Sequence, residues 1–352
     1  MNAMWRFRRK DGGGTATVDL PPELADEWDG TTAELWEEIE RLSAANREQA
    51  DPETERRVLR LRHVAGARAH EESSRRSDFA APDAGALPAG DPLPEFTRAE
   101  LTPGVLRAGI LRDGCVLVRG LIDRDAALAF AERIDVSFAE RERHDSGETP
   151  EAGYYEEFVP NLPFKGVLGR QWIKDGGGVL AADSPKVAFE MFDLFRAAGL
   201  QPLVDGYLGE PSVISVHKTT LRKASPAVPG AWHQDGSFMG DVRSLNLWLS
   251  LSRCGDVAPG LDLVPRRLDH LVTRQTEEAM LDIQVSQAKA EEAAGDVGIV
   301  RPIFEPGDAL FFDELFLHQT GSDPSMPHPR FAIENWFFGA SAFPREFAPL
   351  AA

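Results

Sequence analysis

The chain has 352 residues, with 38 lysines and arginines against 57 aspartates and glutamates, so its formal net charge is −19 with histidine neutral. This excess of negative charge would repel a nucleic-acid backbone or an anionic membrane surface, so we expect neither as a partner. Hydrophobic residues make up 42% of the chain and charged residues 27%, which is typical of a globular protein and excludes a wholly disordered one.

The targeting signals and the cysteines both indicate a cytoplasmic protein. The basic first ten residues lead into Asp11–Gly14 instead of an apolar stretch, so we expect no secretory signal. No run approaches the ~18 apolar residues of a membrane span. The two cysteines, Cys115 and Cys254, form no CxxC pair, which argues against a disulfide framework and a cysteine-based zinc site. We therefore expect a reducing, cytoplasmic location.

Residues 1–95 are expected to form an N-terminal extension. Residues 1–30 mix glycine, proline and acidic residues, and we expect them to be extended or poorly ordered. Between Thr31 and Ala80, apolar residues recur at helical spacing, which predicts two helices separated at Asp51-Pro52, because proline suits the first turn of a helix but not its interior. Residues 80–95 are rich in proline and glycine and are expected to be a linker.

Residues 96–345 are expected to form one domain with helices in its first half and strands in its second. The predicted helices are Arg98–Arg112, Arg124–Glu140, Pro185–Ala198 and a shorter one ending near Leu208, with a strand at Cys115–Arg119. From Ser212 onward, short β-type runs alternate with turns at Ser212–Arg222, Ser244–Ser252, Asp262–Val264, Ile299–Phe304, Ala309–Phe312 and Arg330–Phe338, with a helical insertion at Thr276–Ala294.

Many short strands separated by turns favour an antiparallel barrel or a two-sheet jelly roll over a parallel α/β sheet. The predicted fold class is therefore mixed α+β. It has a double-stranded β-helix core of the cupin type, flanking helices and the helical N-terminal extension.

One short motif carries most of the chemical information. In the run Trp232–Gly236, His233 and Asp235 are two positions apart, so in an extended backbone their side chains point to the same side while Gln234 points away. Two imidazoles and one carboxylate form the ligand set of non-haem Fe(II) sites, which keep open positions for substrates. The second imidazole is expected from His318, in the run Phe316–Gly321.

An arginine follows at the start of an otherwise apolar predicted strand. Arg330 begins the run Arg330–Phe338, and a guanidinium buried there would need a carboxylate partner. That partner is either a ligand or a structural ion pair with Glu334 or Asp313, and the sequence leaves both open.

The order of these residues resembles the Fe(II)- and 2-oxoglutarate-dependent oxygenases. More narrowly, the chain is similar to the phytanoyl-CoA dioxygenase family in the runs Leu247–Leu251, Ala258–Pro265 and Glu305–Asp308, together with the HxD motif and His318. The resemblance covers roughly residues 96–345.

The resemblance implies roles for particular residues. His233, Asp235 and His318 would be the catalytic metal ligands, and Arg330 would bind the distal carboxylate of 2-oxoglutarate. Three further residues would lie near this co-substrate or line the pocket: Thr320, Trp248 and Thr219. For Trp248 an ordinary core position is an equal alternative. The implied activity is hydroxylation of an unactivated C–H bond with O2, releasing succinate and CO2.

The sequence departs from the family pattern outside the metal triad. The chain has Pro259-Gly260 where the family has Asn-Gly, and Pro265–His270 replaces its Pro-Gly-Ser-His-like turn. These departures concern substrate contacts more than metal binding. Because residue 235 is Asp, the coordination position that halogenating relatives leave for chloride is filled, so hydroxylation is preferred over halogenation.

Several alternatives stay open at this stage. The same iron centre could catalyse desaturation, cyclisation or epimerisation. From other classes, a catalytically silent jelly roll that binds a ligand, or a zinc or manganese hydrolase or isomerase, would also contain such a triad.

The partner is expected to be a small-molecule substrate, either small or carrier-linked, and a homo-oligomer stays open. The aromatic segment Gly153–Gly178 is a candidate lid, with Tyr154, Tyr155, Phe158 and Trp172 as pocket walls and Gly176–Gly178 as a hinge. Its aromatic residues could equally be core. Basic residues for the phosphates of a CoA thioester could come from Lys165, Arg170 and Lys174.

Overall fold

The structure is a computed structural model that describes residues 28–73, 78–90, 93–161, 164, 168–240, 242–274 and 283–352. The expectation of an extended start falls mainly on residues 1–27, which lie outside this range. Lys165 and the first part of the predicted helical insertion at Thr276–Ala294 lie outside it as well. The described part of that insertion contains a helix, α9, at Gln287–Ala294.

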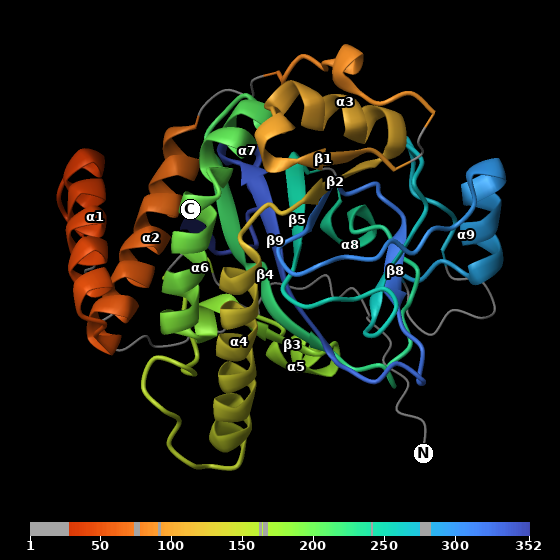
Figure 1. The fold of residues 1–352 in the computed structure, drawn as a ribbon. Helices are drawn as coiled ribbons and strands as arrows, with labels where there is room; N and C mark the ends of the chain where they lie inside the picture. The colour runs from red at the N-terminus through yellow and green to blue at the C-terminus, as the bar shows by residue number, and fades with distance from the viewer. Residues whose placement is uncertain are drawn as a thin grey trace, which may run out of the picture.

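Two antiparallel helices form the outermost layer on one side of the molecule (Figure 1). Helix α1 spans Thr32–Glu48 and begins with a capping box between Thr31 and Glu34. Helix α2 spans Pro52–Glu72, and the side chain of Asp51 accepts a hydrogen bond from the backbone of Thr54 at its start. A carboxylate cap followed by proline at the first helical position ends one helix and starts the next, so the predicted break at Asp51-Pro52 is confirmed.

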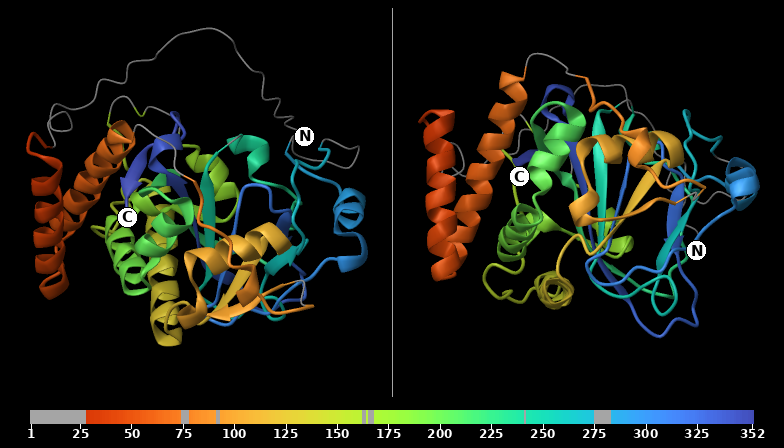
Figure 2. Two further views of the ribbon diagram at one scale, coloured as in Figure 1. Left: turned by 90° about the horizontal axis from the view of Figure 1, so that it is seen from above. Right: turned by 45° about the horizontal axis from the view of Figure 1, so that its top comes forward.

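This helical pair is packed on the rest of the protein. Buried apolar residues of α1 and α2 contact each other and also Phe189 of helix α6 (Pro185–Ala197) and Ala351 near the C-terminus. Helix α2 lies against α6 and against strand β10 (Pro349–Ala351), so it links the outer layer to the sheet behind it (Figure 2). The close approach is visible at Gly66, where a Cβ atom would lie 2.9 Å from the backbone of Leu350.

His63 on α2 ties three segments together. Its Nδ1 lies 2.7 Å from the carbonyl oxygen of Pro349, which can only accept, so Nδ1 carries the proton. Its Nε2 then accepts from the backbone N–H of Asn161 at 3.1 Å. The ring also meets Phe158 and Phe164 edge-on. His63 is thus a neutral, fully bonded buried histidine that fixes the aromatic segment and the C-terminus to α2.

We expect His63 to make stability depend on pH. Burial lowers the pKa of His63 from 6.5 to about 4. The unfolded chain therefore takes up a proton on this residue below pH 6.5 while the folded chain does not, so stability is lost as the pH falls from 6.5 towards 4 and is unaffected above 6.5. For one proton the slope is about 1.4 kcal/mol per pH unit at most.

Urea unfolding between pH 4 and pH 8 measures this effect. His63→Gln should flatten the dependence of the unfolding free energy below pH 6.5, whereas His144→Gln, at a half-exposed histidine on helix α4 (Arg124–Asp145), should leave it unchanged. Parallel curves for wild type and His63→Gln would contradict the assignment.

The predicted linker is held in place by hydrogen bonds. The backbone N–H of Ala80 donates to Tyr207, and that of Asp83 donates to Gly104. The ring of Phe79 contacts Tyr207 and lies under the guanidinium of Arg107. The described residues between 78 and 90 therefore run along the helices α3 (Pro103–Asp113) and α7 (Leu200–Leu208).

A large sheet forms the centre of the fold. Its strands are β1 (Glu95–Thr97), β2 (Cys115–Arg119), β3 (Gly178–Leu180), β4 (Ser212–Ala224), β5 (Ser244–Ser250), β7 (Ala309–Phe312), β9 (Arg330–Gly339) and β10 (Pro349–Ala351). The order is β1-β2-β7-β5-β9-β4-β10, with β3 also pairing with β4. All pairs are antiparallel except β1 with β2. The sheet extends to Ala351, which lies beyond residue 345, the predicted end of the domain.

The two faces of this sheet have different neighbours, because successive side chains of a strand point to opposite sides. On β5, Leu247 and Leu249 belong to the core shared with the helices, whereas Trp248 belongs to a second core. On β9, Phe337 belongs to the first core and Trp336 to the second. We call the side of the second core the inner face.

Helices cover the other face. They are α3 (Pro103–Asp113), α4 (Arg124–Asp145), α6 (Pro185–Ala197) and α7 (Leu200–Leu208), all of which contribute to the first core. The short helices α5 (Arg170–Asp175) and α8 (Gly236–Met239) lie at the sheet's edge and beside its inner face, respectively (Figure 1).

A second, smaller sheet stands opposite the inner face. It pairs β6 (Gly260–Leu263) with β8 (His318–Gly321). Isolated antiparallel bridges extend it on both sides, from His318 to His233 and from Leu263 to Val300. Leu261 and Leu263 share the second core with Trp248. The fold is thus mixed α and β with two facing sheets. The predicted strand Ile299–Phe304 is reduced to bridges at its two ends.

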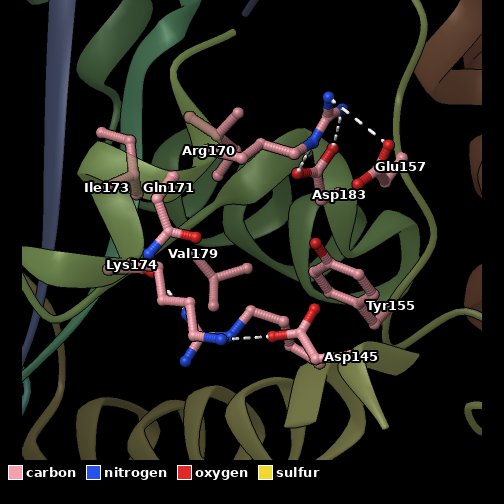
Figure 3. A pocket seen from close by; sticks show the side chains of 12 residues that line it. Asp145, Tyr155, Glu157, Arg170, Gln171, Ile173, Lys174, Val179 and Asp183 are labelled. Atoms are coloured by element: carbon pink, nitrogen blue, oxygen red, sulfur yellow. Dashed lines mark hydrogen bonds and ion pairs between the residues drawn. The ribbon is translucent and has the colours of Figure 1, made fainter. Parts of the chain in front are cut away.

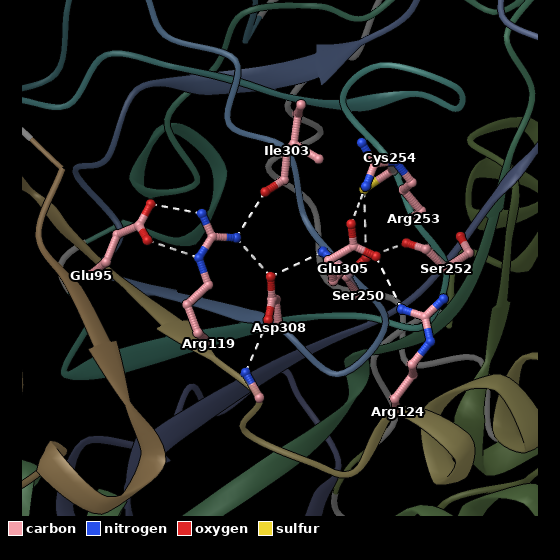
Figure 4. Close-up of polar contacts among 11 residues, drawn as sticks. Glu95, Arg119, Arg124, Ser250, Ser252, Arg253, Cys254, Ile303, Glu305 and Asp308 are labelled. Atoms are coloured by element: carbon pink, nitrogen blue, oxygen red, sulfur yellow. Dashed lines mark hydrogen bonds and ion pairs between the residues drawn. The ribbon is translucent and has the colours of Figure 1, made fainter.

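A buried carboxylate holds the turn that precedes β7 (Figure 4). Asp308 accepts from the guanidinium of Arg119 at 2.7 Å and from the backbone N–H groups of Gly120 and Glu305, each at 2.9 Å. Arg119 also pairs with Glu95 at the sheet edge. Asp308 therefore fixes the strand that returns towards His318.

Replacement of Asp308 tests this role. Asp308→Ala leaves two backbone N–H groups and a partly buried guanidinium without their acceptor, and should lower the unfolding free energy by about 3 kcal/mol. Glu95→Gln removes the exposed partner of the same Arg119 and should lower it by less than about 1 kcal/mol. Chemical denaturation measures both, and equal losses would contradict the assignment.

Within the described residues, none of the helices combines the length and the apolar character needed to cross a membrane.

Candidate metal centre

The backbone brings His233 and His318 side by side. They form an antiparallel bridge in which each backbone N–H donates to the other's carbonyl, at 3.0 and 3.1 Å. His318 is in turn paired with Leu263 across β8 and β6. Two histidines far apart in the sequence therefore become cross-strand neighbours, with ring centroids 4.5 Å apart.

The hydrogen bonds of the two rings leave one nitrogen of each available. Nδ1 of His233 lies 2.7 Å from the carbonyl oxygen of Ala231, and Nδ1 of His318 lies 3.1 Å from that of Phe316. Since a carbonyl can only accept, both Nδ1 atoms carry protons and both Nε2 atoms present lone pairs. This arrangement is typical of metal-binding histidines, whose second nitrogen donates to the backbone.

Asp235 completes a three-residue cluster. One ligand atom from each of His233, Asp235 and His318 lies within 4.8 Å of the others, so the group could hold a metal ion. Asp235 is the residue before α8, and its side chain makes no capping bond to that helix. The carboxylate lies 3.9 Å from Nε2 of His318, too far for a hydrogen bond.

The burial of the cluster favours a bound cation. Burial raises the pKa of Asp235 to about 6 and, together with the nearby His233, lowers the pKa of His318 to about 3. A buried carboxylate beside neutral imidazoles lacks a compensating positive charge within the triad. A divalent ion would supply it.

Gln234 points away from the cluster, as predicted. Its amide nitrogen donates to the carbonyls of His270 and Leu315, and its oxygen accepts from the backbone N–H of Val272. The side chain is buried and its bonds clamp the HxD loop to two neighbouring segments. Gln234 thereby fixes the orientation of His233 and Asp235 on either side of it.

Arg330 lies on the inner face and forms no ion pair with any carboxylate that the structure describes. Its residue is 1% exposed, and burial lowers the pKa of its guanidinium to about 10. Its Nη1 donates a hydrogen bond to the carbonyl of Gly260 at 3.2 Å, and its Nε has no hydrogen-bond partner among the described residues. The structural alternatives do not occur, because Asp313 pairs with Arg267 and Glu334 pairs with Arg222.

Trp248 and Thr320 line the same space between the two sheets as Arg330. The guanidinium of Arg330 stands 5.2 Å from the ring centroid of Trp248, which also packs on Phe304. Thr320 is paired with Leu261, so it shares the side of β8 that carries His318. The structure thus brings the triad, Arg330, Trp248 and Thr320 to the space between the two sheets.

The structure does not bring Thr219 to this space. Thr219 is paired with Asn335, and its hydroxyl lies 2.8 Å from the carbonyl of Ser215 and 2.7 Å from Oδ1 of Asn335. Leu247, the other strand partner of Asn335, packs on the helices. The expectation that Thr219 lines the pocket is therefore corrected, and its neighbour Thr220 occupies the inner face instead.

Sequence reasoning missed a group of polar residues on the inner face. Across the strands, Thr220 is paired with Glu334 and Glu334 with Trp248, while Arg222 is paired with Ala332. Several buried polar atoms on this face lack hydrogen-bond partners among the described residues: Thr220 Oγ1, Arg222 Nε, Asn246 Oδ1 and Nδ2, Arg330 Nε and Trp336 Nε1. Such a concentration of unbonded polar atoms indicates a place for a polar ligand.

The aromatic segment divides into core and surface. Tyr154, Tyr155 and Phe158 are buried in the core shared with the helices, which favours their structural interpretation. Trp172 on α5 is 55% exposed, and Lys218 stands 5.9 Å from its ring. Of the four candidate walls, Trp172 is the one that lies at the surface near Lys218.

The glycines after α5 form a fixed turn. Gly177 has a φ of 72°, and a Cβ atom on it would lie 2.8 Å from the carbonyl oxygen of Lys223. Lys223 also donates its backbone N–H to Gly177. These contacts hold the start of β3 on β4 and argue against a hinge.

A cavity of about 440 Å³ lies away from the triad, between α4, α5 and β3 (Figure 3). Two of the basic residues suggested for CoA phosphates line it, and both are neutralised. Arg170 forms a bidentate pair with Asp183, and Lys174 bonds Asp145 at 2.6 Å. Neither is available as a phosphate site without breaking an ion pair.

Comparisons with known proteins show a likeness of fold to solved structures. No family model matches the sequence, and no curated protein matches it. The solved structure of EctD from S. alaskensis with 2-oxoglutarate and 5-hydroxyectoine is 16% identical, with a TM-score of 0.50, and the match covers 77% of this chain and 86% of that one.

Two further solved structures match less well. AviO1 from Streptomyces viridochromogenes Tue57 is 19% identical, with a TM-score of 0.41 over 69% of this chain and 98% of that one. The α-ketoglutarate-dependent epimerase SnoN from nogalamycin biosynthesis is 17% identical, with a TM-score of 0.40 over 67% of this chain and 82% of that one. At these identities the likeness to EctD establishes a shared fold and no more.

Proposed function

We propose that the chain is a non-haem, Fe(II)- and 2-oxoglutarate-dependent oxygenase that hydroxylates an unactivated C–H bond of a small or carrier-linked metabolite. One observation carries the proposal. The His233–Asp235–His318 cluster and the buried Arg330 line the same space between the two sheets, and Arg330 has no carboxylate partner among the described residues. A metal triad alone suits several chemistries. A metal triad beside an unpaired buried guanidinium suits a metal and a dicarboxylate together.

The residues present fit Fe(II). Two imidazole nitrogens with protons fixed on Nδ1 and one carboxylate provide the donors that such sites use. When bound, ferrous iron with 2-oxoglutarate would supply the activation of O2, with decarboxylation of 2-oxoglutarate to succinate and CO2. The protein holds the donors in place through Gln234 and through the backbone bridge between the two histidines.

The inner face fits 2-oxoglutarate. Arg330 would bind the distal carboxylate, with Thr320 near it and Trp248 supporting the guanidinium. Thr220 and Arg222 offer unbonded buried polar atoms on the same face and would serve as further contacts. EctD, whose fold the chain shares, contains 2-oxoglutarate in its structure. The assignment to this chain rests on its own residues.

The placement of the metal ligands and Arg330 between the two sheets also supports our more specific predictions for the fold and the family. We propose that the two facing sheets are the two halves of a double-stranded β-helix, and that the family is that of phytanoyl-CoA dioxygenase. We also propose that residues 1–95 are an extension that packs on residues 96–345 and holds the aromatic segment through His63. The substrate is proposed to be a small molecule.

The three metal ligands and Arg330 would also be compatible with desaturation, cyclisation or epimerisation. Product analysis separates these reactions from hydroxylation. A silent ligand-binding protein is less favoured, since it would not require an intact triad. A hydrolase or isomerase with zinc or manganese has no use for an unpaired buried arginine.

Conversion of 2-oxoglutarate in the absence of substrate tests the proposal. With Fe(II) and O2, the protein should form succinate slowly, because such enzymes turn over without their substrate at a low rate. Zn(II) in place of Fe(II) should abolish succinate formation. A protein that binds metal but neither binds nor consumes 2-oxoglutarate would contradict the proposal and favour the hydrolase.

A further inference from the structure

A lysine lies beside the candidate metal centre and forms no ion pair with an acidic side chain in the described part of the chain. Lys218 is on β4, in the irregular stretch between Ile214 and Thr219, and is partly buried. Its ammonium group contacts the ring of Phe238 on α8, the helix that begins directly after Asp235, which places Lys218 beside the same centre. None of the described residues makes a hydrogen bond or an ion pair to its ammonium group.

Three aromatic rings from separate parts of the chain surround this ammonium. Its Nζ lies 4.0 Å from the ring centroid of Phe238, 5.7 Å from that of Phe347 and 5.9 Å from that of Trp172. Phe238 is on α8, the helix that begins directly after Asp235. Phe347 is held by stacking on His217 at 5.0 Å. The rings fix the ammonium and shield it partly from water.

Two of these rings also offer apolar surface. Trp172 is 55% exposed and Phe238 is 37% exposed, which is unusual for large aromatic side chains. Together with Lys218 they form an apolar surface with one positive charge at its centre. We call Lys218, Trp172 and Phe238 the mouth cluster.

The local charge balance leaves Lys218 uncompensated. Arg222 is compensated by Glu334, 3.7 Å away. A divalent ion and Arg330 would carry three positive charges, which Asp235 and a 2-oxoglutarate dianion would balance with three negative ones. The net charge of −19 repels anions at long range, so an anion would be bound here only by a specific local charge.

We propose that the mouth cluster binds the substrate, and that the substrate is an organic carboxylate with an apolar or aromatic body. This inference rests on the proposed function. The carboxylate pairs with Lys218, and the body lies against Trp172 and Phe238 next to the metal. A charge-assisted hydrogen bond in this partly desolvated place fixes which end of the substrate reaches the metal.

A matched pair of probes tests the charge requirement. 4-Fluorophenylacetate and its neutral analogue 4-fluorophenylacetamide are titrated against the full chain by fluorine NMR, with Zn(II) in place of Fe(II) and saturating 2-oxoglutarate, so that Arg330 is occupied. The wild type should bind the carboxylate at least about tenfold more tightly than the amide. Lys218→Met should abolish that preference.

Two more variants complete the test. Lys223→Met is the control, because Lys223 is on the same strand but pairs with Asp135 on α4, and it should keep the preference. Trp172→Ala changes an exposed side chain, so the fold should persist while both probes bind more weakly. Equal binding of the two probes, no binding of either, or an unchanged preference in Lys218→Met would overturn the inference.

The proposed function is measured separately in the same sample. Calorimetric titration with 2-oxoglutarate precedes the probes. If 2-oxoglutarate does not bind but the preference depends on Lys218, the oxygenase proposal fails and the anion site stands. If 2-oxoglutarate binds and there is no preference, the substrate inference alone fails.

Discussion

Asp235→Ala is expected to lower the affinity for Fe(II) by more than about 100-fold and to abolish succinate formation. Removing even a residue that supports a metal ligand typically reduces metal affinity 10- to 100-fold, so losing the one charged ligand should have a larger effect. The two imidazoles that remain are neutral and cannot balance a divalent ion. Equilibrium dialysis with Fe(II) under anaerobic conditions measures the affinity.

The fold should survive this substitution. Asp235 is buried, and its carboxylate has no hydrogen bond that the described residues supply, so its removal leaves no partner unsatisfied. His270→Ala is a suitable control, because this nearby histidine is exposed and contributes only its backbone carbonyl to Gln234. Full Fe(II) affinity in Asp235→Ala, or an equal loss in His270→Ala, would contradict the triad.

Arg330→Met is expected to separate co-substrate binding from stability. A buried charge-assisted pair with a carboxylate contributes several kcal/mol to binding, so the affinity for 2-oxoglutarate should fall by about 100-fold or more. Fe(II) binding should be nearly unchanged. Calorimetric titration of the metal-loaded protein with 2-oxoglutarate measures the difference.

The stability of the metal-free variant provides the discriminating result. Arg330 is buried and has no ion pair with the described residues, so replacing it by an apolar side chain of similar length should leave the unfolding free energy unchanged or raise it. A structural ion pair would give the opposite sign, with a loss of about 3 kcal/mol or more. Denaturant titration of both proteins without metal decides between the two. A strongly destabilised variant with normal 2-oxoglutarate binding would remove Arg330 from the site.

Local spacing was enough to predict the centre of the site. His233 and Asp235 share a side because they are two residues apart, and Gln234 between them points away, as the structure confirms. His318 and Arg330 depend on long-range pairing that no local pattern specifies. They were assigned from their order along the chain. The backbone bridge between His233 and His318 is the physical contact that brings His318 to the HxD motif.

The register of β4 explains what was missed. A strand with a regular period would place alternate residues on one face from Ser212 onward, but the pairing with β9 shifts between Ile214 and Thr219. After the shift, Thr220 and Arg222 are on the inner face of the sheet, while Thr219 is on the face covered by the helices. Between these two pairs β4 has three more residues than β9, and an odd number of extra residues reverses every later side chain of the strand, which hydrophobic alternation alone does not reveal.

The charged residues of the site also gave a weak sequence signal. Lys218, Arg222 and Glu334 look like solvated strand residues when read locally. Their meaning comes from neighbours such as Phe238 and Phe347, which arrive from other parts of the chain. The packing of α2 on the sheet was unpredictable for the same reason, because His63 finds its partners at Pro349 and Asn161.

The most direct test of the oxygenase proposal is an anaerobic titration of the metal-free protein with Fe(II) and 2-oxoglutarate, followed by visible absorption. Chelation of the 2-oxo acid by ferrous iron should give a weak metal-to-ligand charge-transfer band in the wild type, and the band should be absent in His318→Ala. If the protein binds Fe(II) and no band forms at saturating 2-oxoglutarate, the co-substrate and the role of Arg330 are wrong.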